Sequence, residues 1–369
     1  LLLVAWTTLM QWCVFSPEFV PALTLVSGAS SASDAALAAA EGAQRGGAIA
    51  SLLDAIARDA LWRWVACATA LAVWFAGTGT NAESANTTSL HNMYAARLVR
   101  AYLGAVNDRR LGDDEGAGLS ASAEGTSPET LSDVTAVHPD DDLPLDRYDP
   151  STNGGPIHLV NLCLNQTRGH RSGLYNADRK GVPLTIGAHG LRVGALRVPL
   201  DGSGRLGTLG RWVAISGAVA SPGAGAYTTP GWASLLFLAG ARLGFWLDMR
   251  GVADPRDGHA RPPRRFSAEA WRDRWQATKM GRLASEFRAV YGGPLARNWY
   301  LSDGGHFDNT GVHALLEREL DLIVLADCGA DPRYELADLE NLVRKARIDF
   351  GADIEFYTGD DANALHRRL

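Results

Sequence analysis

The clearest pattern of apolar and polar positions lies between residues 298 and 327. A short aromatic and apolar run, 298–302, predicts a strand that ends at Asp303. Two glycines follow, and we expect them to adopt φ values that other residues avoid. The run 322–326 is unbroken and apolar, as in a strand covered on both faces. Between them, apolar residues recur at helical spacing: Val312, Leu315, Leu316 and Leu320.

This strand, glycine turn, helix and buried strand form a unit of α/β type, and the chain around it agrees. Residues 107–149 are rich in acids and poor in apolar positions, so we expect a solvated loop there. Further elements are predicted around this unit: strands at 157–164 and 192–198, helices at 267–280, 281–291 and 336–346, and a closing strand at 348–356. The pattern therefore predicts the α/β fold class.

The first eighty residues have a different composition. Residues 48–59 show a one-sided apolar stripe, and residues 61–76 are apolar nearly all round. Two interpretations stay open for this helix. It is either a buried core helix, or a membrane-associated helix with Trp62, Trp64 and Trp74 at the level of the lipid headgroups. The chain opens with Leu1 inside another apolar run, so we expect it to be a piece of a longer protein.

Charge and cysteine content exclude several classes of function. The net charge of the 369 residues is −6, and no block is rich in lysine or arginine. A nucleic-acid partner is therefore not expected, because such a surface concentrates positive charge. The four cysteines are far apart and lack any Cys-x-x-Cys pair, which indicates neither a disulfide framework nor a zinc site.

Asp303 is the main candidate for chemistry, because the predicted fold presents it at the end of a strand. Taken by itself it could also be a turn acid that accepts hydrogen bonds from local N–H groups. His306 and His313 lie nearby but lack the spacing of a zinc helix, so no metal is expected. Ester hydrolysis also needs a nucleophile, and the chain contains no Gly-x-Ser-x-Gly elbow.

Four blocks resemble the C-terminal part of patatin-like phospholipases and, more distantly, the group IV cytosolic phospholipases A2. The first is Asp303-Gly304-Gly305 with Asn309 behind it, and the second is 214–222, Ala-Ile-Ser-Gly-Ala-Val-Ala-Ser-Pro. The other two, 89–104 and 155–161, are similar to large bacterial members that carry membrane segments. The blocks occur in the family's order, and the resemblance covers about residues 89 to 356.

The resemblance implies an incomplete patatin-like three-layer hydrolase fold with a mixed central sheet and additional N-terminal apolar helices. It also implies a Ser-Asp dyad in which Asp303 is the base and the serine lies upstream of this chain. The expected substrate is a lipid or phospholipid, with no cofactor and no metal, at a membrane surface on the cytoplasmic side. The residues expected to line the substrate pocket are Gly304, Gly305, Ser216, Gly217 and Asn309.

Two functions and one geometry follow from these expectations. We expect residues 1–80 to be an apolar, membrane-associated helical segment and residues 81–369 to be the later part of a lipid acyl hydrolase domain. The alternative function is a membrane-bound scaffold that keeps the fold without catalysis. If Asp303 is a catalytic base, the segment 216–222 should line the same cleft. The strand 300–302 should then lie beside the strand that ends at Asp327.

Overall fold

The computed structural model describes residues 60–79, 81–107, 138–168, 179–200, 202, 204, 206–249 and 268–356. The chain divides into two compact units, Leu1–Thr80 and Asn81–Leu369. In the first unit the described element is α5, Ala60–Thr78, which lies where the all-round apolar helix is predicted. Among the helices within the described residues, none combines the length and apolar character needed to cross a bilayer. The predicted stripe at 48–59 lies outside the described residues.

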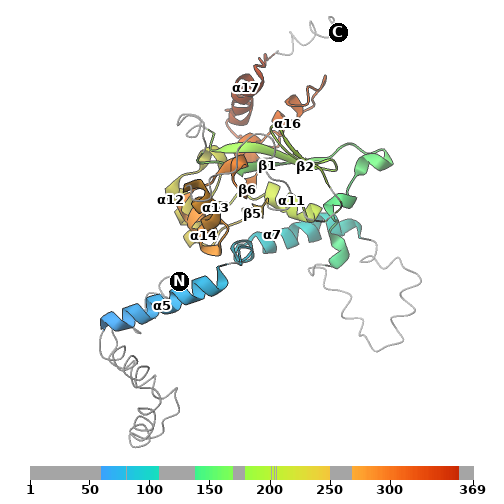
Figure 1. The fold of residues 1–369 in the computed structure, drawn as a ribbon. Coiled ribbons are helices and arrows are strands. Elements are labelled where there is room, and N and C mark those ends of the chain that lie inside the picture. The colour runs from blue at the N-terminus through green and yellow to red at the C-terminus, as the bar shows by residue number, and fades with distance from the viewer. Residues whose placement is uncertain are drawn as a thin grey trace, which may run out of the picture. The chain divides into compact units, whose positions relative to one another are not determined.

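The second unit is built on a six-stranded sheet with the order β4-β3-β2-β1-β6-β5 (Figure 1). Every pairing in it is antiparallel. The strands are β1 Leu159–Asn165, β2 Gly181–Gly187, β3 Gly190–Val193, β4 Leu196–Val198, β5 Phe245–Asp248 and β6 Asn298–Asp303. The α/β class is thus confirmed, but the expected mixed central sheet is wrong among the described strands.

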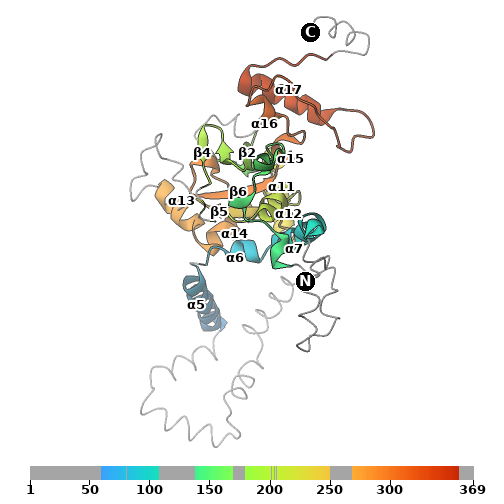
Figure 2. The same ribbon diagram turned by 90° about the vertical axis from the view of Figure 1, so that its right-hand side faces the viewer.

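Helices of the second unit cover both sides of this sheet. In Figures 1 and 2, α7 and α11 lie on one side and α16 and α17 on the other. The α-helices are α6 Ser84–Thr87, α7 His91–Leu98, α11 Leu209–Ser216, α12 Pro230–Leu238, α13 Ala268–Gln276, α14 Lys279–Arg288, α15 Gly305–Asp308, α16 His313–Leu316 and α17 Ala337–Phe350. A π-helical turn, Val99–Leu103, follows α7, and 3-10 turns occur at Gly104–Val106, Pro139–Asp141, Leu145–Arg147, Pro150–Asn153, Gly225–Tyr227 and Gly293–Leu295.

The main core lies between α11 and one face of the sheet. Alternate residues of β1 point to this face, as the two-residue period of a strand requires: Val160, Leu162 and Leu164. They pack with Trp212 and Ile215, which occupy one face of α11 at helical spacing. These side chains are nearly all removed from water, so the core fixes the position of the last residue of α11, Ser216.

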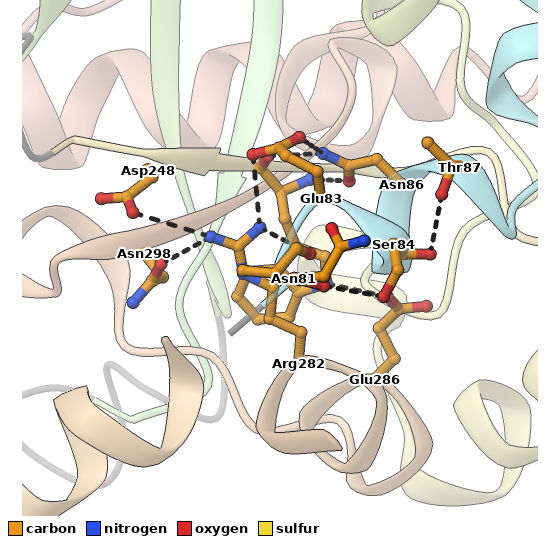
Figure 3. Close-up of polar contacts among 11 residues, drawn as sticks. Asn81, Glu83, Ser84, Asn86, Thr87, Asp248, Arg282, Glu286 and Asn298 are labelled. Atoms are coloured by element: carbon orange, nitrogen blue, oxygen red, sulfur yellow. Dashed lines mark hydrogen bonds and ion pairs between the residues drawn. The ribbon is translucent and has the colours of Figure 1, made fainter. Parts of the chain in front are cut away.

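A buried polar network attaches α6 and α14 to β5 and β6 (Figure 3). Arg282 of α14 is fully buried; its Nη2 donates to Asn298 Oδ1 at 2.8 Å and its Nη1 to Ala82 O at 3.1 Å. Asn86 of α6 pairs with the backbone of Trp246 through two hydrogen bonds of 2.8 and 2.9 Å. These buried hydrogen bonds join the two helices to the strands of the sheet.

Two predicted strands near the C-terminus are wrong. Residues 321–336 form no helix or strand, and within the apolar run Leu322 and Val324 are 79% and 85% exposed. A strand needs a neighbour, and both neighbours of β6 are already taken, by β1 and β5. The predicted contact of residues 300–302 with residues 322–326 is therefore absent. The closing strand at 348–356 is also absent, because α17 continues to Phe350 and residues 351–356 are irregular.

Smaller differences have local causes. The strand predicted at 192–198 is a hairpin, in which Gly194 with φ +55° lies in the turn between β3 and β4. The helix predicted after residue 311 is shortened to α16. The acid-rich segment is not solvated throughout, because Asp141 is buried and Asp142 accepts a hydrogen bond from Gly210 N of α11 at 2.8 Å. Residues 108–137 of that segment lie outside the described residues.

Candidate active-site cleft

An open cleft of about 610 Å³ lies where β6 ends. Its lining comes from β1, β6, α7, α11 and the loop after β6. The structure brings together here every residue that the sequence proposed for the site: Asp303, Gly304, Gly305, Ser216, Gly217 and Asn309. The two blocks 214–222 and 303–309 are far apart in the sequence, so this meeting results from the packing of α11 against β1 and β6.

Asp303 is the last residue of β6 and is partly buried in the wall of the cleft. Its Oδ1 accepts a hydrogen bond from Gly305 N at 2.7 Å. Burial raises the pKa of Asp303 above its usual value, and the bond from Gly305 N opposes that rise. No lysine or arginine occurs among the described residues that line the cleft, so no cation there offsets the effect of burial.

Gly304 and Gly305 are needed for close contact rather than for unusual dihedrals. Gly304 has φ −60°, and neither glycine has a positive φ, so the expectation of forbidden φ values is wrong. A β-carbon on Gly304 would lie 2.5 Å from Asn161 O, and one on Gly305 would lie 2.6 Å from Asn309 Oδ1. The loop after β6 therefore lies too close to β1 and to Asn309 for a larger residue.

We expect Gly304→Ala to destabilise the second unit by about 1–3 kcal/mol, as overpacking against fixed atoms does. The clash is with a backbone oxygen of β1, which cannot rotate away as a side chain would. Gly231→Ala in α12 is the matched control, because nothing lies within 4 Å of its β-carbon. Urea unfolding measures both variants, and equal midpoints would contradict a tight contact at Gly304.

Ser216 joins three parts of the cleft. Its Oγ donates to Asn161 O of β1 at 2.7 Å, and its own carbonyl accepts from Gly304 N at 3.1 Å. Both Ser216 and Asp303 are described, and no hydrogen bond joins their side chains. The structure thus gives Ser216 a role in positioning the Asp303 loop against β1.

Sequence reasoning missed several residues that line the cleft: Tyr94, His158, Asn161 and Asp308. Tyr94 lies over Gly217, since a β-carbon there would be 2.5 Å from the Tyr94 hydroxyl. Burial raises the pKa of Tyr94, and the nearby negative charge of Asp303 raises it further. Three of them could have been found from the sequence, because Tyr94, His158 and Asn161 fall in the blocks 89–104 and 155–161.

The side chains beyond Gly305 mainly support the loop. Asn309 Nδ2 donates to Asp338 Oδ2 of α17 at 2.6 Å, and Asp308 Oδ2 accepts from His313 N at 2.8 Å, at the start of α16. Burial lowers the pKa of His306 to about 4, which keeps its ring neutral beside Ser302 Oγ. Across the part of the chain that is described, no three His, Cys, Asp or Glu side chains converge as a metal site.

Comparison with known proteins adds no relative. No family model, no curated protein and no solved structure matches this chain. The geometry by itself supplies a carboxylate with a raised pKa in an open cleft, with apolar walls from Leu98, Leu159 and Val213. Such a group can accept a proton from a hydroxyl placed within about 2.6–3.2 Å of it.

Proposed function

We propose that the cleft belongs to a lipid acyl hydrolase of patatin-like type. This chain supplies the Asp of a Ser-Asp dyad, and Asp303 is the base. The observation that carries the proposal is the position of Asp303, which lines one cleft with the segment that contains Ser216 and Gly217. The raised pKa of Asp303 strengthens it as a proton acceptor. The apolar residues Leu98, Leu159 and Val213 suit an acyl chain.

The proposed nucleophile is a serine outside this chain. Ester hydrolysis requires a hydroxyl that attacks the carbonyl and N–H groups that stabilise the oxyanion. Ser216 is a poor candidate, because its hydrogen is donated to Asn161 O and it ends a helix instead of following a strand. The backbone N–H groups of Gly304 and Gly305 are likewise engaged, with Ser216 O and Asp303 Oδ1. The lipid substrate implies that the enzyme acts at a membrane surface.

We expect the chain alone to hydrolyse a p-nitrophenyl ester no faster than background, because nucleophile and oxyanion donors are both missing. The measurement is the release of p-nitrophenol by the purified chain and by its Ser216→Ala variant. Turnover above background that Ser216→Ala abolishes would contradict the proposal and make Ser216 the nucleophile. Activity that appears only with the part containing a Gly-x-Ser-x-Gly segment would support it.

A non-catalytic scaffold is the second candidate function, and two hydrogen bonds in the cleft favour it. The side chains of Ser216 and Asp303 both support the cleft structurally, through Asn161 O and Gly305 N. A scaffold would leave the longer protein inactive toward esters while its binding to lipid persisted. Assays of ester hydrolysis and lipid binding on the same longer protein therefore separate the two functions.

A further inference from the structure

A second pocket, of about 380 Å³, lies on the β2–β3–β4 side of the sheet and shares Leu159 with the Asp303 cleft. Its floor is apolar and is formed by Ile157, Leu159, Leu315 and Leu320. Three arginines also line it: Arg192 of β3, Arg197 of β4 and Arg318, which follows α16. A concave apolar surface of this size with a few converging charged groups is typical of a ligand site.

The strand register brings two of these arginines together. Arg192 lies directly opposite Arg197 in the antiparallel pair of β3 and β4, and opposite Thr185 in the pair of β2 and β3. The three residues are therefore neighbours across one face of the sheet. Like charges in directly opposed positions are destabilising, so this arrangement costs stability unless an anion lies between them.

Arg318 adds a third positive charge to the same place. Its Nη2 donates to Thr185 Oγ1 at 3.3 Å, next to Arg192 in the register. Burial lowers the pKa of Arg318, and the charges of Arg192 and Arg197 lower it further against the opposing effect of Glu317. The guanidinium groups are thus close enough to repel one another.

The negative charge available to this group is incomplete. Within the described part of the chain, Glu317 is the carboxylate that forms ion pairs here, with Arg192 at 3.0 Å and with Arg318 at 4.0 Å. One carboxylate against three guanidinium groups leaves an excess of positive charge. In addition, Arg192 Nε is buried and has no hydrogen-bond partner, so part of the hydrogen-bonding capacity of this arginine is unused.

We propose that this pocket binds an acidic amphiphile, with an anionic headgroup at Arg192, Arg197 and Arg318 and a short apolar portion on the leucine-lined floor. Guanidinium groups suit such a headgroup, because their planar N–H pairs match phosphate or carboxylate oxygens. The apolar floor distinguishes this site from a simple phosphate site, which would not need it. The inference is independent of catalysis at Asp303.

Calorimetric titration of the full chain with dihexanoyl phosphatidic acid tests the proposal. Two further titrants separate the contributions: inorganic phosphate has the charge without the tail, and dihexanoyl phosphatidylcholine has the tail without the net charge. We expect phosphatidic acid to bind at least tenfold more tightly than either. Equal affinity for inorganic phosphate would show that the apolar portion does not contribute and would overturn the proposal of an amphiphilic ligand. Equal affinity for phosphatidylcholine would overturn the proposed role of the arginines.

Variants place the binding in this pocket. The double variant Arg197→Gln/Arg318→Gln should bind phosphatidic acid at least tenfold more weakly, whereas Arg333→Gln, at an arginine whose side chain is 79% exposed, should stay within twofold. Arg197→Gln alone changes an exposed side chain, so it keeps the test valid if the double variant does not fold; it should weaken binding at least threefold. Wild-type affinity in the folded variants would refute the site.

Discussion

In a longer protein that supplies the serine, Asp303→Asn is expected to lower kcat for a p-nitrophenyl ester by about 10³-fold or more, the scale seen when an acid of a catalytic triad is replaced. The amide has nearly the shape of the carboxylate and still offers an oxygen to Gly305 N, but it cannot accept the proton of the nucleophile. Steady-state kinetics measure the loss. Asp353→Asn, at an exposed acid, should change kcat by less than twofold.

The folding stability of Asp303→Asn provides a second test, which is independent of the enzyme kinetics. Because burial raises the pKa of Asp303, the folded state holds this proton more tightly than the unfolded chain does. Its stabilising contribution is therefore present below the unfolded pKa and is lost as pH rises through the folded pKa. We expect Asp303→Asn to be more stable than the wild type at pH 7, and the difference to vanish near pH 3.

That outcome separates a functional acid from a structural one. If Asp303 served only to accept the hydrogen bond from Gly305 N, its negative charge would not cost folding free energy. Asp303→Asn should then have an unfolding free energy at pH 7 equal to or lower than that of the wild type. Urea unfolding at the two pH values is the measurement. Lower stability of Asp303→Asn at pH 7, together with unchanged kcat in the longer protein, would leave Asp303 as a turn acid.

The candidate cleft was largely predictable because its signals are local. A strand that ends at Asp303, followed by two glycines, needs only neighbouring residues to be recognised. The contribution of 214–222 came from the order of sequence blocks, which carries spatial information that periodicity does not. Even so, the reason for Gly304 was misjudged, because the close approach of Asn161 O is a contact across strands that no local pattern reveals.

The sheet was less predictable because pairing is decided by partners far away in sequence. An unbroken apolar run such as 322–326 favours a strand, yet whether it becomes one depends on a free neighbour, which β6 does not offer. The direction of pairing is likewise set by the connections, and β1 meets β6 antiparallel through Leu162 and Asp303. Arg282 shows the same limit, since its helix is visible in the sequence and its buried partners are not.

Replacing that arginine, Arg282→Met, is expected to destabilise the second unit by about 3–5 kcal/mol, the usual cost of removing one member of a buried charged network. Methionine fills similar space, so the loss would come from polar groups left without a partner rather than from a cavity. Asn298 Oδ1 and Ala82 O would each lose a donor inside the protein. Arg347→Met is the control, because that side chain is 67% exposed and its ion pair with Asp353 contributes little.

The loss should also depend on pH, through Glu286. Burial raises the pKa of Glu286 to about 7, and the charges of Arg242 and, to a smaller extent, Arg282 oppose that rise. Without Arg282 the folded pKa rises further, and a raised folded pKa means stability that is lost as pH increases through it. Arg282→Met should therefore be destabilised more at pH 8 than at pH 5, measured by urea unfolding. Equal losses at both values would show that Glu286 does not sense Arg282, and a loss below about 1 kcal/mol would show that Arg282 is not needed to hold α14 on the sheet.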